Sequence, residues 1–148
     1  MIHTILKHSH SGLRWILLFF IVAAVISAFV SMKQNKNYGK NDKLLHLGTL
    51  IVVHIQLLIG FILYFIGFGT KIDFSQMANS MIRFYTVEHS LMMILAAAAV
   101  TIGYSKSKKI SNSADRFKII FYTYLIAVIL IFLAIPWPFR SNLGAAWF

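Results

Sequence analysis

The stretch LRWILLFFIVAAVISAFVSM, Leu13 to Met32, decides the class of this protein, because Arg14 is its only charged side chain. A helix of about 20 residues, with about 1.5 Å of rise per residue, crosses the roughly 30 Å hydrocarbon core of a bilayer. Three further apolar runs of similar length follow, at Leu44 to Phe68, Phe84 to Tyr104 and Ile119 to Trp137. The sequence therefore predicts one all-α domain over residues 1–148, an integral membrane bundle of four helices that run alternately up and down.

The overall composition agrees with a membrane protein. Of the 148 residues, 59% are hydrophobic and only 12% are charged, whereas soluble domains carry about 25% charged residues. A cleaved signal peptide is the alternative interpretation of the first run, because Ala28 and Ser31 are small, but the positive segment before it is weak and we expect a retained span. The absence of cysteine excludes disulfides, cysteine-held iron–sulfur clusters and covalently attached c-type haem.

The positive charges are placed as in a membrane protein rather than a nucleic-acid-binding one. Nine of the fourteen basic residues lie in or beside two connectors: Lys33, Lys36, Lys40, Lys43, Lys106, Lys108, Lys109, Arg116 and Lys118. Positive loops face the cytoplasm, so these connectors are expected inside and both termini outside. All three tryptophans, Trp15, Trp137 and Trp147, then fall at the outer ends, as an aromatic belt does. The predicted partner is the lipid bilayer, and nucleic acid is not expected.

The connector GTKIDFSQMANSMIR, residues 69–83, is too long for a simple turn. Asp73 followed by Gln76 resembles a capping box. Phe74, Met77, Met81 and Ile82 are spaced to form one face of a short interfacial helix. The sequence predicts such a helix between the second and third spans, as a lid over the outer end of the bundle.

Three histidines lie on three different predicted spans, between the middle of the bilayer and its outer face. His54 is close to the centre of its apolar run, where a polar side chain is costly and usually has a partner. His89 heads a stripe with Ala96 and Gly103 at intervals of seven, which leaves room for a neighbouring helix or a flat ligand. His10 stands at the outer end of the first span. Neutral imidazoles in an apolar bundle suit the axial positions of a b-type haem.

One haem b is expected, in the outer half of the bundle. His46, at the inner end of the second span, has no histidine at its depth on another span, so at most one bis-histidine site can be built. With about 1.5 Å of rise per residue, His54 lies near the centre, His89 about 7 Å outward and His10 roughly 18 Å outward. The pair His54–His89 is therefore preferred as axial ligands, with His10–His89 as the alternative.

Charged residues flank the same outer end. Arg14 and Arg83, with Trp15, are placed to bind the propionates of the haem. Arg83 and Glu88 are expected at the outer membrane interface, where they can also pair with each other as a salt bridge.

Other interpretations stay open at this point. The three histidines together can ligate copper or zinc, or can hydrogen-bond helices to one another in an accessory or assembly subunit. Met92 or Met93 as an axial ligand is less favoured than a packing role. A proton relay through Glu88, His89 and His54 lacks ionisable groups in the inner half apart from His46. No carboxylate pair or serine–histidine–aspartate pattern indicates a hydrolytic enzyme, so an electron carrier or a subunit is favoured over a self-contained enzyme.

Five segments carry a resemblance to a known group of proteins. They are HSHSGLRW (8–15), HIQLLIGFILYF (54–65), MIRFYTVEHSLMM (81–93), TIGYSKSKK (101–109) and IPWPFR (135–140). Together they resemble the small bacterial four-helix membrane proteins labelled cytochrome b, over nearly the whole chain. The resemblance implies a b-haem electron carrier of the bacterial inner membrane, with His10, His54 and His89 as the positions in those segments. A quinol or a larger redox complex is the implied partner, and Gln56 with the lid segment is placed to border a quinone pocket.

Overall fold

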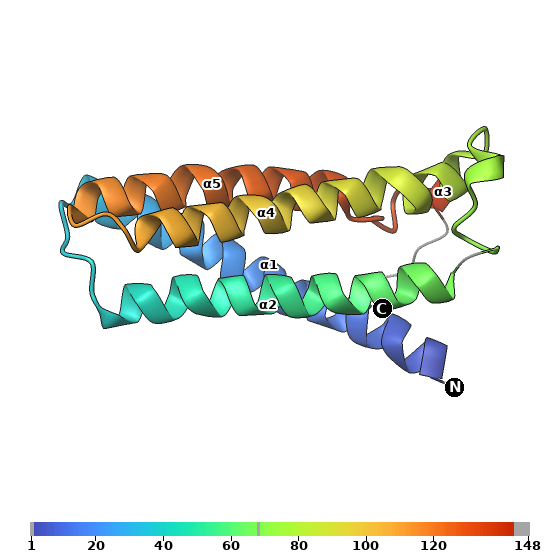
Figure 1. Ribbon diagram of the computed structural model, residues 1–148, viewed down its shortest axis with the longest axis horizontal. Coiled ribbons are helices and arrows are strands. Elements are labelled where there is room, and N and C mark those ends of the chain that lie inside the picture. Colours follow the sequence, from blue (N-terminus) through green and yellow to red (C-terminus); the bar gives the residue numbers. More distant parts are fainter. Residues whose placement is uncertain (1, 68, 144–148) are drawn as a thin grey trace.

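The computed structural model describes residues 2–67 and 69–143, which are mainly helical (Figure 1). The elements in chain order are α1 (Ile2–Lys33), α2 (Lys40–Ile66), the 3₁₀ turn η1 (Phe74–Gln76), α3 (Ser80–Arg83), the π-helical η2 (Phe84–Glu88), α4 (His89–Ser107), α5 (Ser113–Ala134) and the 3₁₀ turn η3 (Ser141–Leu143). Helices α3, η2 and α4 follow one another without a break from Ser80 to Ser107. Within the described residues, four helices are long and apolar enough to cross a membrane: α1, α2, Ser80–Ser107 and α5. The predicted all-α architecture with four apolar helices is confirmed.

The four long helices run alternately in opposite directions along one axis (Figure 1). Helix α1 packs against α2 and α5, and α4 packs against α5 and α2, so the order around the bundle is α1, α2, α4, α5. The end at which α1 begins and α5 finishes, on the right of Figure 1, is called the terminal end below. The opposite end, with the connectors 34–39 and 108–112, is called the basic end.

The closest helix approach lies between α4 and α5. A Cβ atom added at Gly103 would overlap the side chain of Thr123, so only glycine fits at this crossing. Ala96, Ala97 and Val100 of α4 are buried in the same core. Small residues allow helices in a bilayer to pack closely without a hydrophobic driving force between them. The small-residue stripe that follows His89 therefore serves mainly the packing of α4 against α5.

Helix α2 is the least buried of the four. Only 17% of its most apolar 18-residue window is buried, against 28–39% in the other three long helices. Two polar contacts hold it to α1: Thr49 Oγ1 donates to the Phe20 carbonyl at 3.2 Å, and Gln56 Nε2 donates to the His10 carbonyl at 2.7 Å. This loose packing of α2 leaves space between α1, α2 and α4 at the terminal end.

The helices extend beyond the predicted spans at several ends. Helix α1 includes the polar lead-in and starts at Ile2 instead of Leu13. Helix α5 starts earlier than predicted, because the Asn112 side chain accepts a hydrogen bond from the Asp115 N–H and caps it. It ends before Pro136, which has no N–H to continue a helix. Two predicted positions, Phe68 at the end of the second span and Trp147 of the aromatic belt, lie outside the described residues.

The predicted interfacial helix between the second and third spans is not formed, and the connector contains the single turn η1 instead. The Asp73 carboxylate accepts from the Ser75 N–H at 2.8 Å, but its own N–H donates to Thr86 Oγ1 at 3.1 Å, so no reciprocal capping box with Gln76 exists. Asn79 starts the third helix, because its side chain accepts from the N–H groups of the two residues that follow Ser80. Met81 and Ile82 therefore belong to the third long helix.

Candidate functional site

A cavity of about 360 Å³ lies between α1, α2 and α4 at the terminal end. Pockets that hold small ligands or cofactors are typically roughly 300–1,000 Å³. Leu17, Met93 and Ile131 line its deeper part, and polar and basic side chains line the part nearer the terminal end. The cavity has the size and the graded polarity of a site for an amphipathic ligand.

Two histidines from different helices face this cavity. His10 of α1 and His89 of α4 both line it, and their ring centres are 6.3 Å apart with 71° between the ring planes. Of the two ligand pairs that the sequence allowed, the structure brings together His10 and His89.

The orientation of His89 is set by a hydrogen bond to another helix. His89 Nδ1 lies 2.8 Å from the Ala134 carbonyl oxygen, which only accepts, so Nδ1 carries the proton. In the neutral ring the lone pair is then on Nε2, the arrangement found in metal-ligating histidines. The π-helical η2 ends directly before His89, and such wide turns occur frequently at functional sites. Ser90 Oγ donates to the Tyr85 carbonyl at 2.9 Å, which satisfies a backbone acceptor within this wide turn.

The position of His10 depends on two residues of α2. Gln56 Nε2 donates to the His10 backbone carbonyl, and Gly60 lies beside the His10 ring. A Cβ atom at Gly60 would come within 3.3 Å of His10 Cε1, so the glycine makes room for the imidazole. His10 Nδ1 is buried without a hydrogen bond of standard geometry among the described residues. Gln56 Oε1 is likewise buried without a hydrogen-bond partner in this part of the chain.

The preference for His54 as a ligand is corrected by the structure. His54 is exposed on the outside of the bundle, with Nδ1 2.8 Å from the Leu50 carbonyl and Nε2 3.3 Å from Thr101 Oγ1. Thr101 follows His89 by twelve residues on the same helix, which corresponds to about 18 Å along the axis. Because two residues turn a helix by about 200°, Gln56 facing α1 places His54 on the opposite side of α2. His54 and His89 therefore do not form a pair.

The two predicted arginines have different environments. Arg14 lines the cavity and is 9% exposed, and its guanidinium lies 5.2 Å from the centre of the Trp15 ring. Arg83 is not among the described residues that line the cavity; its Nε lies 2.9 Å from Glu88 Oε1 in an exposed salt bridge. The assignment of Arg83 as a cofactor-binding residue is therefore not supported, and its pairing with Glu88 accounts for it.

Two lysines that the sequence did not assign to the site line the cavity. Lys7 belongs to the same face of α1 as His3, His10 and Arg14, a spacing that was visible in the sequence. Lys71 comes from the connector between α2 and η1, where no helical period indicated which way it would face. Its placement depends on the path of the connector.

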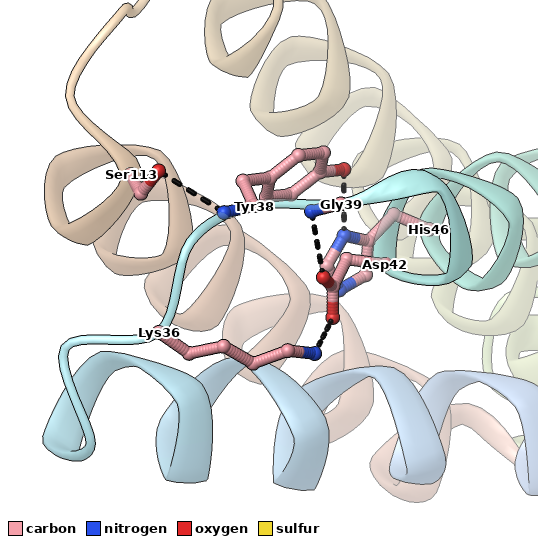
Figure 2. A network of polar contacts seen from close by, with 6 residues as sticks. All are labelled: Lys36, Tyr38, Gly39, Asp42, His46 and Ser113. Atoms are coloured by element: carbon pink, nitrogen blue, oxygen red, sulfur yellow. Dashed lines mark hydrogen bonds and ion pairs between the residues drawn. The ribbon is translucent and has the colours of Figure 1, made fainter.

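The basic end contains a different kind of histidine environment (Figure 2). His46 is fully buried, and its Nδ1 lies 2.9 Å from the Tyr38 hydroxyl. Figure 2 also shows Lys36 and the Gly39 N–H bonded to Asp42, and the Tyr38 N–H donating to Ser113 Oγ at 3.0 Å. Burial raises the pKa of Tyr38 to about 12. The rings that pack against His46 are those of Tyr38, Phe117 and Tyr124.

A three-histidine copper or zinc centre is not supported by the arrangement. Among the described residues, no three side chains of His, Cys, Asp or Glu come close enough to share a metal ion. His54 is separated from His10 and His89, so the predicted trio does not converge on one point.

Comparison with known proteins gives no assignment for this site. No protein-family model matches the chain, and no curated protein or solved structure matches it.

Proposed function

We propose that this chain is a membrane b-type haem protein that holds one haem between His10 and His89 and exchanges electrons with a quinol or a larger redox complex. The observation that carries the proposal is the separation of the two imidazoles. With about 2 Å from a metal ion to each coordinating nitrogen, and about 1 Å more to each ring centre, imidazoles on opposite sides of one ion have centres about 6 Å apart. The observed separation is 6.3 Å, and both rings line the same cavity.

The surrounding residues suit this role. Ala134 holds the proton on His89 Nδ1 and leaves Nε2 available as a ligand. Gln56 and Gly60 hold His10 against α2. Leu17, Met93 and Ile131 provide apolar walls that keep water from the flat face of a macrocycle. A bound haem would supply one-electron chemistry at its iron, whose potential the protein adjusts through axial ligands and burial.

The distribution of basic residues suggests the orientation in the membrane. The connectors 34–39 and 108–112 and the helix ends beside them carry nine of the fourteen Lys and Arg residues. By the positive-inside rule the basic end faces the cytoplasm, so the cavity lies near the outer face of a bacterial inner membrane. Electron exchange would then take place at that outer face.

The first test is an optical spectrum of the protein purified in detergent, oxidised and then reduced with dithionite. A Soret band that sharpens on reduction, with separate α and β bands, is the expected result, either as purified or after addition of haem. Protein that stays colourless in both cases contradicts the proposal and favours an accessory subunit without a redox role.

Histidine variants then test the ligand pair. His10→Ala and His89→Ala are each expected to lose the six-coordinate low-spin spectrum, because each removes one axial imidazole. His54→Ala is the matched control and is expected to keep it, since the His54 ring is bonded to Leu50 and Thr101 outside the cavity. A normal spectrum in His89→Ala would rule out the His10–His89 pair.

A further inference from the structure

Basic side chains from two separate segments meet where the cavity approaches the terminal end. His3, Lys7 and Arg14 line it from one face of α1, and Lys71 lines it from the connector after α2. The spacings of four and seven residues keep the three α1 side chains on one face, and Lys71 lies 64 positions further along the chain than Lys7. The cavity is therefore basic near the terminal end and apolar at depth.

The side chains that line this part of the cavity are mainly basic or neutral. The described residues that line the cavity include no Asp or Glu. Asp and Glu contribute four side-chain carboxylates to the chain. Asp42 and Asp115 belong to the basic end, Asp73 bonds to Ser75 and Gln76, and Glu88 bonds to Arg83. Among the described residues, therefore, no Asp or Glu side chain of the cavity lining neutralises the positive charge of Lys7 and Lys71.

Lys71 is partly shielded from solvent and lies near a second positive charge. Burial and, to a smaller extent, the neighbouring Lys7 lower the pKa of Lys71. Lys71 Nζ lies 5.1 Å from the centre of the Tyr85 ring, a contact that directs the ammonium toward the cavity lining. Two lysines that repel each other beside a cavity are stabilised by an anion that bonds to both.

We infer that Lys7 and Lys71 bind the carboxylate groups of an amphipathic ligand whose apolar body occupies the deeper cavity. This inference rests on the proposed function, under which the carboxylates are the propionates of the haem. Lys7 lies three residues before His10 on the same face of α1, about 4.5 Å along the helix axis, so one ligand can contact both. Propionate binding, which the sequence analysis assigned to Arg14 and Arg83, is thus assigned to Lys7, Lys71 and Arg14.

The test uses metal-free protoporphyrin IX, because it needs no axial ligand, and its dimethyl ester, which lacks the two carboxylates. Binding to the full-length protein in detergent is followed by porphyrin fluorescence. In the double variant Lys7→Gln/Lys71→Gln, affinity for the diacid is expected to fall at least about tenfold, because two charge-assisted hydrogen bonds are lost. Affinity for the dimethyl ester is expected to stay as in the wild type.

A matched control is Lys40→Gln/Lys43→Gln, which removes the same charge at the basic end and is expected to leave both affinities unchanged. The inference is overturned if the Lys7/Lys71 double variant binds the diacid as tightly as the wild type, or if diacid and ester weaken equally. Failure of the axial assignment gives a different result. In that case haem keeps its six-coordinate spectrum in His89→Ala. The Lys7→Gln/Lys71→Gln variant still loses affinity for the diacid and keeps its affinity for the ester. The inference about the two lysines then holds without the His10–His89 pair.

Discussion

Both ends of the bundle contain histidines, but in opposite settings: His46 is fully buried, whereas His10 and His89 are half-buried. At the basic end, His46 is enclosed by the rings of Tyr38, Phe117 and Tyr124, with ring centres 5.6 to 6.4 Å away. At the terminal end, His10 and His89 face a cavity of about 360 Å³. A histidine surrounded by its own chain serves the fold, whereas two histidines that face one space are available for a ligand. The comparison shows that depth in the membrane does not distinguish these roles; the completeness of the packing around the ring does.

The largest expected effect is on stability, at the basic end. His46→Ala removes a fully buried ring and leaves the Tyr38 hydroxyl without this partner, so the free energy of unfolding should fall by about 2–4 kcal/mol. Thermal unfolding in detergent, followed by circular dichroism, measures this change. His54→Ala, on the exposed side of α2, is the control and should change stability far less. Equal stability of the two variants would show that the basic end is not a packing site.

The next effect concerns the terminal end. In Gly60→Val the added side chain meets the His10 ring, and overpacking of this kind costs about 1–3 kcal/mol. If the proposed haem binds through His10, this corresponds to about a 5- to 150-fold loss of haem affinity. Gly48→Val is matched to it, because a Cβ at Gly48 comes within 3.2 Å of Phe20 Cε1 on the same pair of helices but away from the cavity. Haem titration should show weaker binding only for Gly60→Val. Similar losses in both variants would mean that general distortion of α2, and not the position of His10, controls binding.

A smaller effect is expected from the contact that anchors His10. Gln56→Leu removes the 2.7 Å hydrogen bond to the His10 carbonyl, which should cost about 1 kcal/mol and loosen the start of α1. Hydrogen exchange of the backbone amides in residues 9–14 should become faster. Thr49→Val is the control, because it removes a comparable bond to the Phe20 carbonyl deeper in the bundle. If residues 9–14 exchange at the wild-type rate in Gln56→Leu, another contact holds His10.

The smallest effect is a pH dependence at the basic end. The folded pKa of Tyr38, about 12, lies above its ordinary value of 10.0 because burial disfavours the phenolate. The stability that this contributes is complete below about pH 10 and is lost as the pH rises toward 12. The midpoint of thermal unfolding should therefore fall more steeply in the wild type than in Tyr38→Phe as the pH rises from 10.0 to about 12. Tyr122→Phe, which changes an exposed tyrosine of α5, should keep the wild-type slope; identical slopes in all three proteins would contradict the prediction.

Several features of the site were predictable because they depend only on position along the chain. The depth of His46 within its run predicts no histidine beside it on another span. The spacing of His3, Lys7, His10 and Arg14 predicts that they share one face of a helix. The pairing of Arg83 with Glu88 was foreseen as an alternative, because five residues separate them on one helix, and the structure contains it at 2.9 Å. Lys71 was missed, because a connector has no period from which a direction can be inferred.

The amino-acid sequence by itself determined the number of apolar helices, the uneven distribution of basic charge and the set of histidines, since each follows from composition and the rise of a helix. Only the tertiary structure decided which histidines meet. The sequence predicted a pair from depth alone and favoured His54, but the rotation of α2 about its axis is set by its packing. Contacts of Thr49 and Gln56 with α1 direct that face inward and leave His54 outside. Depth is a one-dimensional property of a helix, and a shared site also requires that the helices face each other.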